Sequence, residues 1–273
     1  MLRAGLIGNP VAHSRSPRMH NAAFRALGID ATYELWLTEL DEIPARVASI
    51  REAGMLGANV TVPHKQHVMP HCDRLTETAS RAGAVNTLIP TDEGLLGENT
   101  DVYGFAQSVR ETIGDAIPER AVLLGAGGAA RGVIVALQEL GVAEITIANR
   151  TVAKAAEIAT ALSLPDRAPI MGIALADVSD VLDGVGLLVN STSVGWEGDE
   201  LPVSLEAIAA LPDGALVMDL TYRETSFLRV ARARGLPTRD GAGMLLHQGA
   251  RAFELWTGQD APVEIMRAAM FAD

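Results

Sequence analysis

Three polar side chains cluster near the end of one predicted strand. Residues 55–62 alternate as a strand does and lead into Pro63 and Lys65. Asn59 and Thr61 fall on one face of this strand, because strand side chains repeat every two residues. An amide, a hydroxyl and an ammonium at this position predict ligand binding or proton transfer. The alternative is an edge strand with a polar side and a surface lysine, and the local pattern does not separate the two.

A second polar segment follows the first predicted strand, residues 2–7. Ser16 is typical of a helix N-cap with Pro17 as the first helical residue, and this predicts a helix that ends at Gly28. Capping accounts for Ser16 but leaves Ser14 unexplained. Two hydroxyls at the carboxyl end of a strand therefore suggest a ligand contact, with simple capping as the alternative.

A glycine-rich turn lies near the middle of the chain. The apolar run 121–124 predicts a strand, and residues 129–140 carry apolar side chains at helical spacing up to Gly141. Between them, residues 125–130 read Gly-Ala-Gly-Gly-Ala-Ala and match the pattern G-x-G-x-x-A. Strand, glycine turn and helix together predict a pyrophosphate site at the helix N-terminus.

The end of the next predicted strand, 144–148, indicates which dinucleotide would bind. NAD-binding chains usually carry an acidic residue here, but this chain has Asn149, Arg150 and Thr151, with Lys154 one turn further on. The guanidinium group of arginine can form two hydrogen bonds to a 2′-phosphate or stack against it, so the sequence favours NADP over NAD. The alternative is a solvated Arg–Lys pair, which would oppose the helix dipole at that position.

A histidine-rich stretch raises the question of a metal site. His64, His67, His71 and Cys72 lie close together, but Pro70 interrupts any helix that would align them, and no second ligand cluster follows. We therefore expect no metal.

Composition excludes several classes of protein. The chain has 273 residues, 48% of them hydrophobic, with a mean hydropathy of +0.19, values typical of a folded globular protein. Its net charge of −12 would repel nucleic acid. Cys72 is the single cysteine, and neither a signal peptide nor a membrane-spanning run is evident. We expect a soluble cytoplasmic protein that binds neither nucleic acid nor membranes.

Strands and helices alternate along the chain, which predicts an α/β fold with parallel sheets. Besides those above, strands are expected at 31–36, 84–89, 185–190, 215–219 and 237–239. Helices are expected at 41–52, 76–82, 102–113, 152–162, 226–234, 244–256 and 262–271. The stretches around 163–178 and 197–203 carry no clear pattern.

Eight short motifs, in their order along the chain, resemble those of the shikimate dehydrogenase family. They lie at residues 8–21 (G-x-P-x-x-H-S-x-S-P-x-x-H-N), 59–65 (N-V-T-V-P-H-K), 83–87 (G-A-V-N-T), 99–101 (N-T-D), 125–131, 149–151 (N-R-T), 190–192 (N-S-T) and 243–256. The resemblance covers almost the whole chain. It implies a substrate-binding α/β domain of residues 1–101 plus 243–273, a Rossmann-type NADP-binding domain of residues 102–242, and a cleft between them.

The resemblance also implies a role for individual residues. Lys65 and Asp101 would form the catalytic pair. The substrate would be held by Ser14, Ser16, Asn59, Thr61, Asn86, Asp101, Tyr222 and Gln248. NADP would be held by Gly125, Ala126, Gly127, Gly128, Ala129, Asn149, Arg150, Thr151 and Lys154, with Leu220 and Gly241 near the nicotinamide and Glu77 as a further contact.

The implied activity is the reversible, NADPH-dependent reduction of 3-dehydroshikimate to shikimate, a step of aromatic amino-acid biosynthesis. A lysine is ordinarily an acid at neutral pH, which suits reduction of a ketone. Three alternatives stay open at this stage: a quinate or aminoshikimate dehydrogenase, an inactive nucleotide-binding module, and a metal-dependent enzyme. The expected partner is a small-molecule substrate, and the chain is expected to be a monomer or a homodimer.

Overall fold

The computed structural model describes residues 1–272, and its contacts divide the chain into two units. The first consists of Met1–Gly104 and Leu245–Asp273, and the second of Phe105–Met244. The chain passes between the units within two helices, α4 (Thr100–Ile113) and α9 (Ala242–Thr257). The first unit is therefore assembled from two separate stretches of the sequence.

The first unit contains a six-stranded mixed sheet in the order β2-β1-β3-β5-β6-β4. Its strands are β1 (Leu2–Gly8), β2 (Ala31–Leu37), β3 (Met55–Val60), β4 (Arg74–Leu75), β5 (Thr87–Thr91) and β6 (Gly94–Glu98). The predicted parallel arrangement holds for β2, β1 and β3, but β5 runs antiparallel to both β3 and β6. A parallel connection needs a long crossover, and the two residues between β5 and β6 allow only a hairpin.

Two predicted elements of the first unit have different bounds. The strand expected at 84–89 begins at Thr87, and β6 was not predicted at all. The helix expected at 41–52 is a 3₁₀ turn, Leu40–Glu42, followed by α2 (Ile43–Ser49). Pro44 lies in the first turn of α2, where its missing amide hydrogen costs nothing, and this fixes the start of the helix.

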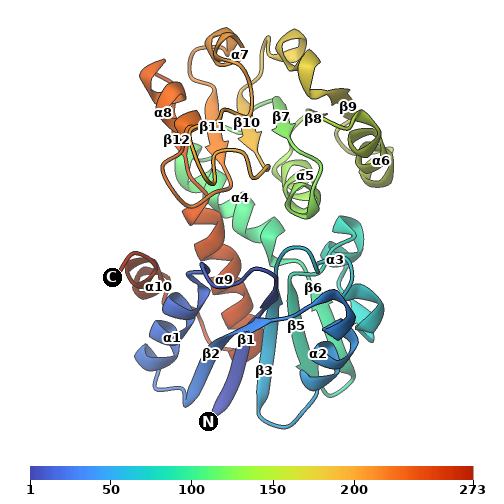
Figure 1. Cartoon of the computed structure of the whole chain (residues 1–273), viewed down its shortest axis with the longest axis vertical. Helices are drawn as coiled ribbons and strands as arrows, with labels where there is room; N and C mark the ends of the chain where they lie inside the picture. The colour runs from blue at the N-terminus through green and yellow to red at the C-terminus, as the bar shows by residue number, and fades with distance from the viewer. Residues whose placement is uncertain (273) are drawn as a thin grey trace. The chain divides into compact units, whose positions relative to one another are not determined.

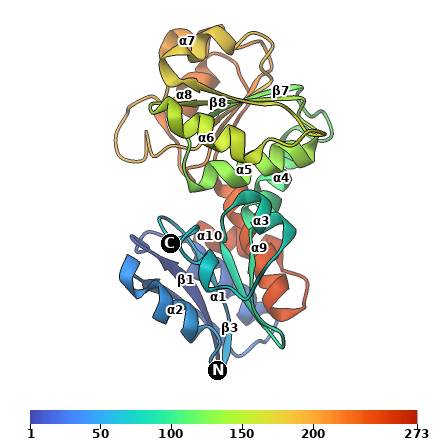
Figure 2. The same ribbon diagram turned by 90° about the vertical axis from the view of Figure 1, so that its right-hand side faces the viewer.

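Helices cover both faces of this sheet. On one face, Val47 of α2 belongs to a buried apolar cluster that also contains Ile7 and Val60. On the other, α1 (Ser16–Ala26) and α9 pack Phe24 against Phe253, with ring centroids 5.3 Å apart. Figure 2 shows α2 and α9 on opposite sides of the strands, and Figure 1 shows the last helix, α10 (Val263–Met270), beside α1. The other helical pieces are α3 (Glu77–Ala82) and a 3₁₀ turn, Met69–His71.

One glycine of β3 allows α9 to approach the sheet closely. Gly57 has a φ of +153°, and a Cβ placed on it would lie 2.2 Å from Nε1 of Trp256. That indole nitrogen donates a hydrogen bond to the carbonyl oxygen of Leu88 at 3.1 Å. A larger residue at position 57 would therefore separate α9 from the strands that it covers.

The second unit contains a parallel sheet in the order β12-β11-β10-β7-β8-β9. Its strands are β7 (Arg120–Leu124), β8 (Glu144–Asn149), β9 (Ile170–Ala174), β10 (Leu187–Asn190), β11 (Leu216–Asp219) and β12 (Thr238–Arg239). Helices α5 (Gly128–Leu140) and α6 (Val152–Leu162) lie in front of this sheet in Figure 2, and α8 (Ser226–Ala233) lies behind it. The strand order reverses between β7 and β10, which defines a doubly wound fold with its ligand-binding edge at the carboxyl ends of those strands.

Three elements of the second unit had no clear sequence pattern. They are β9, a 3₁₀ helix (Leu175–Val181) and α7 (Leu205–Ala210). β9 is an edge strand with both faces partly exposed, so it lacks alternation, and α7 is too short to show helical periodicity. Ser204 caps α7 by accepting a hydrogen bond from the amide of Ala207. None of the helices within residues 1–272 is long and apolar enough to span a bilayer.

The first unit buries a histidine without hydrogen bonds. The His20 ring is fully buried, neither ring nitrogen has a partner among the described residues, and the ring stacks on Tyr33 with centroids 4.3 Å apart. Burial disfavours the charged imidazolium and lowers the pKa of His20 to about 3. The folded state must therefore keep His20 neutral, while the unfolded chain takes up a proton near pH 6.5.

We predict that this histidine makes stability fall as the solution becomes acidic. The loss begins as pH drops below 6.5 and continues down to the folded-state pKa of about 3. Between pH 7 and pH 5 the wild type should lose about 2 kcal/mol of unfolding free energy through His20 alone. Urea unfolding of wild type and His20→Phe at both pH values measures this term. An equal loss in both proteins would contradict the prediction.

Candidate active site

An ion pair between a lysine and an aspartate lies in the first unit. Nζ of Lys65 donates a hydrogen bond to Oδ2 of Asp101 at 2.6 Å, and the two side chains are 14% and 7% exposed. Lys65 follows β3, and its carbonyl oxygen accepts a hydrogen bond from the amide of Val85. Asp101 lies in the first turn of α4, where the helix dipole favours a negative charge. The structure thus brings together two residues that are 36 positions apart.

Asn86 holds the second oxygen of that aspartate. Its Nδ2 donates to Oδ1 of Asp101 at 2.9 Å. Its Oδ1 accepts from the amide of Thr100 at 2.7 Å and from the hydroxyl of Thr87 at 3.0 Å. These donors fix which end of the amide faces which way, because an amide turned over would place its NH₂ against them. Oδ2 of Asp101 is therefore left for Lys65.

Gln248 reaches the same cluster from α9. Its Oε1 lies 3.4 Å from Nδ2 of Asn86, and its Nε2 donates to the carbonyl oxygen of Leu245 at 2.9 Å. The side chain is only 8% exposed. The predicted residues Lys65, Asn86, Asp101 and Gln248 thus form one connected group.

The two predicted serines lie at the start of α1. Ser16 was expected to be the N-cap of this helix, but it is the first helical residue. The N-cap position belongs to Arg15, whose side chain forms no capping hydrogen bond. Instead, the hydroxyl of Ser14 accepts a hydrogen bond from the amide of Ser16 at 3.2 Å. Ser14 therefore binds the amide of the first helical residue without being the N-cap, and Ser16 is buried with an exposed fraction of 4%.

Asn59 and Thr61 lie in and just after β3. Asn59 is buried, and both hydrogens of its amide are used within the protein, toward the carbonyl oxygen of Asn86 (3.3 Å) and the hydroxyl of Thr87 (3.1 Å). Thr61 is partly exposed and packs against Gly8, where an added Cβ would lie 2.3 Å from its methyl group. Of the two, only Thr61 has a side chain that is accessible to solvent.

The glycine-rich turn of the second unit has the predicted strand–turn–helix context. Gly125 has a φ of +103°, and a Cβ on it would lie 2.8 Å from the Ser191 hydroxyl. At Gly127 and Gly128 an added Cβ would meet no atom within 4 Å, so the space before these residues is open. Helix α5 begins there, and its free amides suit the pyrophosphate of a dinucleotide.

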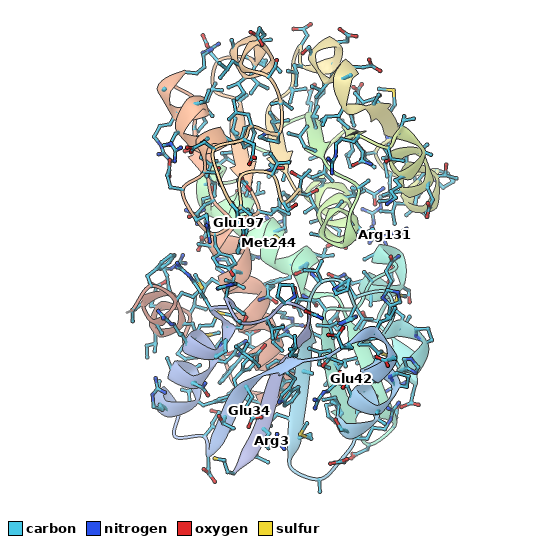
Figure 3. The ribbon with its side chains drawn as sticks, in the orientation of Figure 1. Arg3, Glu34, Glu42, Arg131, Glu197 and Met244 are labelled. Carbon is cyan, nitrogen blue, oxygen red and sulfur yellow. The ribbon has the colours of Figure 1, made fainter. Side chains whose placement is uncertain are left out.

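The predicted 2′-phosphate residues follow β8. Arg150 and Lys154 are exposed, and Asn149 closes the turn by donating from Nδ2 to the carbonyl oxygen of Thr151 at 2.9 Å. Arg150 lines a cavity of about 640 Å³ together with residues 174–176, 178–179 and 201–204. Another cation nearby, Arg131 in the first turn of α5 (labelled in Figure 3), is 3.9 Å from Glu157 of α6. The turn therefore combines exposed cations with a cavity and has no carboxylate of its own at residues 149–151.

A buried aspartate organises the ends of β10 and β11. Asp219 is fully buried and accepts hydrogen bonds from Nδ2 of Asn190, from the amide and hydroxyl of Thr221, and from the hydroxyl of Thr225. Burial raises the pKa of Asp219, and these donors oppose that shift.

The predicted contacts Leu220 and Gly241 lie in the backbone held by this aspartate. The amide of Leu220 donates to the carbonyl oxygen of Asn190 at 2.9 Å. The amide of Gly241 donates to the carbonyl oxygen of Thr221 at 2.8 Å. The ring of Tyr222 packs edge-on against Trp196, with centroids 5.4 Å apart. Glu77, the remaining predicted contact, begins α3 in the first unit and is exposed.

Sequence reasoning missed three residues that shape these sites: Tyr33, Trp196 and Asp219. Asp219 had a detectable signal, since it is an acidic residue at the end of an apolar strand. Tyr33 and Trp196 had none, because an aromatic residue in a strand or loop is ordinary.

The histidines that raised the question of a metal have other contacts. Nε2 of His64 is 2.7 Å from the carbonyl oxygen of Thr38, and Nδ1 of His67 is 3.2 Å from that of Pro63. Among residues 1–272, no three His, Cys, Asp or Glu side chains are grouped to hold a metal ion.

An α/β unit with a buried Lys–Asp pair and a doubly wound unit with an open glycine-rich turn define a dinucleotide-binding α/β protein. Family models agree in detail. Residues 6–88 match the shikimate dehydrogenase substrate binding domain, residues 107–195 match shikimate / quinate 5-dehydrogenase, and residues 241–271 match the shikimate 5′-dehydrogenase C-terminal domain.

Individual relatives match over nearly their whole length. The shikimate dehydrogenase (NADP(+)) of Symbiobacterium thermophilum is 43% identical over 273 residues, covering 98% of this chain and 93% of its own. The structure of Thermus thermophilus shikimate 5-dehydrogenase, in complex with NADP(H) and shikimate, has a TM-score of 0.87 at 38% identity and covers 99% and 98% of the two chains. The chain belongs to the shikimate dehydrogenase family.

A solved quinate dehydrogenase is also similar. The enzyme from Corynebacterium glutamicum, in complex with NAD, has a TM-score of 0.89 at 31% identity, covering 98% of both chains. The fold alone therefore does not separate the two substrates.

Proposed function

We propose that the protein catalyses the reversible, NADPH-dependent reduction of 3-dehydroshikimate to shikimate, a step of aromatic amino-acid biosynthesis. The observation that carries this proposal is the Lys65–Asp101 pair, 2.6 Å apart and largely buried, in a chain of this family. Relatives named for NADP and a solved relative holding NADP(H) and shikimate support it. A binding module would need neither member of the pair, so an enzyme is favoured over an inactive homologue.

Proton transfer is the chemistry that the chain itself supplies. Reduction of a ketone leaves an alkoxide oxygen that must be protonated, and Nζ of Lys65 can donate that proton. Asp101 holds the ammonium in place through Oδ2 while Asn86 holds its Oδ1. In the reverse direction Lys65 takes the proton of the hydroxyl group. NADPH, when bound, supplies the hydride.

We assign the remaining roles as follows. Most of the substrate contacts belong to the first unit and most of the NADP contacts to the second. Lys65 and Asp101 are catalytic, and the substrate hydroxyls and carboxylate are contacted by Ser14, Ser16, Asn59, Thr61, Asn86, Asp101, Tyr222 and Gln248. The cofactor is bound by Gly125, Ala126, Gly127, Gly128, Ala129, Asn149, Arg150, Thr151 and Lys154, with Leu220 and Gly241 at the nicotinamide. Glu77 is assigned to the cofactor on the family resemblance alone.

Quinate dehydrogenase is the second candidate, because the Corynebacterium glutamicum enzyme has the same fold at 31% identity. Exposed cations at Arg150 and Lys154 favour the NADP-dependent activity over it, since the solved quinate enzyme holds NAD. Quinate differs from shikimate by an added water across the ring double bond. The discrimination therefore depends on a few contacts in the substrate site.

A substrate panel tests the assignment. We expect reduction of NADP with shikimate to exceed every other pairing of shikimate, quinate or aminoshikimate with NADP or NAD in kcat/KM. Absorbance of the reduced cofactor at saturating and subsaturating substrate measures each pairing. Higher kcat/KM with quinate and NAD would transfer the assignment to the second candidate.

Lys65→Met should remove proton transfer while leaving most substrate contacts. We expect kcat to fall by about 10²- to 10⁴-fold, the usual contribution of general acid–base catalysis, with a much smaller change in KM. Arg25→Met, which removes an exposed cation from α1, serves as the control and should keep wild-type rates. A loss confined to KM would show that Lys65 only binds.

Arg150→Asp should reverse the cofactor preference. The new carboxylate repels a 2′-phosphate and can accept hydrogen bonds from a free ribose, so the NADPH to NADH ratio of kcat/KM should drop by at least about tenfold. Arg110→Asp changes the net charge equally at an exposed position in α4 and should leave the ratio alone. An unchanged ratio in Arg150→Asp would refute the role of Arg150.

A further inference from the structure

The motif at residues 8–21 contains two residues for which the proposed function has no use. His20 and Asn21 follow the serines, in the middle of α1, and both contact a single residue of β2, Tyr33. Asn21 forms two hydrogen bonds to the backbone of Tyr33, accepting from its amide at 2.8 Å and donating to its carbonyl oxygen at 3.0 Å. His20 stacks on its ring, with an angle of 2° between the planes. Backbone and side chain of Tyr33 are thus both held by α1.

The hydroxyl of Tyr33 lies in the buried interior of the first unit. The residue is only 2% exposed, and its Oη donates to Oδ1 of Asn59 at 2.9 Å. Burial raises the pKa of this hydroxyl, and the Ser16 side chain opposes that shift. Trp256 packs beside the ring at 6.2 Å between centroids. Tyr33 therefore links α1 and β2 to the end of β3.

From Asn59 the hydrogen bonds continue without a break to the catalytic pair. Nδ2 of Asn59 donates to the hydroxyl of Thr87, which donates to Oδ1 of Asn86. Nδ2 of Asn86 donates to Asp101, which accepts from Lys65. The Asn59 amide is oriented by the carbonyl oxygen of Asn86, which can only accept, and the hydroxyl of Tyr33 supplies the donor to Oδ1 of Asn59.

We propose that Tyr33 is a positioning residue for the substrate site: its hydroxyl holds the side-chain oxygen of Asn59, and His20 and Asn21 hold Tyr33 in place. This inference rests on the proposed function only for its kinetic test. It reassigns Asn59 from a direct substrate contact to a relay, since both of its amide hydrogens and one side of its oxygen are used within the protein.

The decisive variant is Tyr33→Phe, which keeps the ring and its stacking on His20 but removes the donor. Asn59 then keeps a buried oxygen without its partner, and its side chain loses one of the contacts that hold it in place. We expect KM for shikimate to rise about tenfold, with KM for NADP unchanged and kcat reduced by a smaller factor. Tyr103→Phe, at an exposed tyrosine of α4, is the matched control and should match the wild type.

A purely structural role for Tyr33 predicts a different pattern. It would lower the unfolding temperature and leave both KM values at wild-type levels, and that result would overturn the proposal. Combining Tyr33→Phe with Asn59→Ala sharpens the test, because two residues of one relay should give less than the product of the separate KM effects. Multiplicative effects would contradict the relay.

A readout that does not depend on turnover separates this inference from the proposed function. The side-chain amide NMR signals of Asn59 and Asn86, identified with the corresponding alanine variants, should shift in Tyr33→Phe and stay in place in Tyr103→Phe. If the wild type oxidises neither shikimate nor quinate, the proposed function fails while these shifts still support the relay. Unshifted signals would refute the relay whatever the substrate.

Discussion

The orientation of one side-chain amide, that of Asn86, determines how the Lys–Asp pair is arranged. Asp101 has two equivalent oxygens, and they become distinct only because Asn86 donates to one of them and Lys65 to the other. The amide in turn is oriented by the backbone of Thr100 and the hydroxyl of Thr87. In a site this buried, an unpaired polar group would cost about 1–3 kcal/mol, so the arrangement with every donor paired is strongly favoured.

The mixed sheet of the first unit follows from the same requirement. Antiparallel pairing between β3 and β5 places Asn59 directly opposite Thr87, and the hairpin to β6 places Thr87 opposite Glu98. The chain then enters α4 with Thr100 and Asp101 in its first turn. Three segments from different parts of the sequence thus meet at one edge, and the ion pair forms where they meet. In the second unit, Asn190 and Asp219 occupy matching positions on the parallel strands β10 and β11 and play a comparable structural role there.

Patterns of residues predicted most elements of the second unit and located several candidate site residues. The glycine-rich turn, its strand and its helix were predictable because each is local and has its own chemistry, as were Lys65 at a strand end and Arg150 after β8. The pairing of Lys65 with Asp101 rested on the family resemblance, since no local pattern connects residues 36 apart. The hairpin of β5 and β6 escaped prediction because Pro90 and Gly94 read as a turn, although Pro90 lies within β5. Tyr33 was invisible because its role depends on contacts from α1 and β3.

The insertion of the second unit within the first has a consequence for biosynthesis. While the chain emerges from the ribosome, residues 105–244 are complete before the rest of α9 is made, so the second unit has all its strands available first. The first unit must wait, because Trp256 covers Gly57 and Gln248 joins Asn86 only after the last helices have been synthesised. A nascent chain therefore exposes the α9 face of its N-terminal sheet until α9 has been synthesised. Chaperones have that interval in which to protect the sheet.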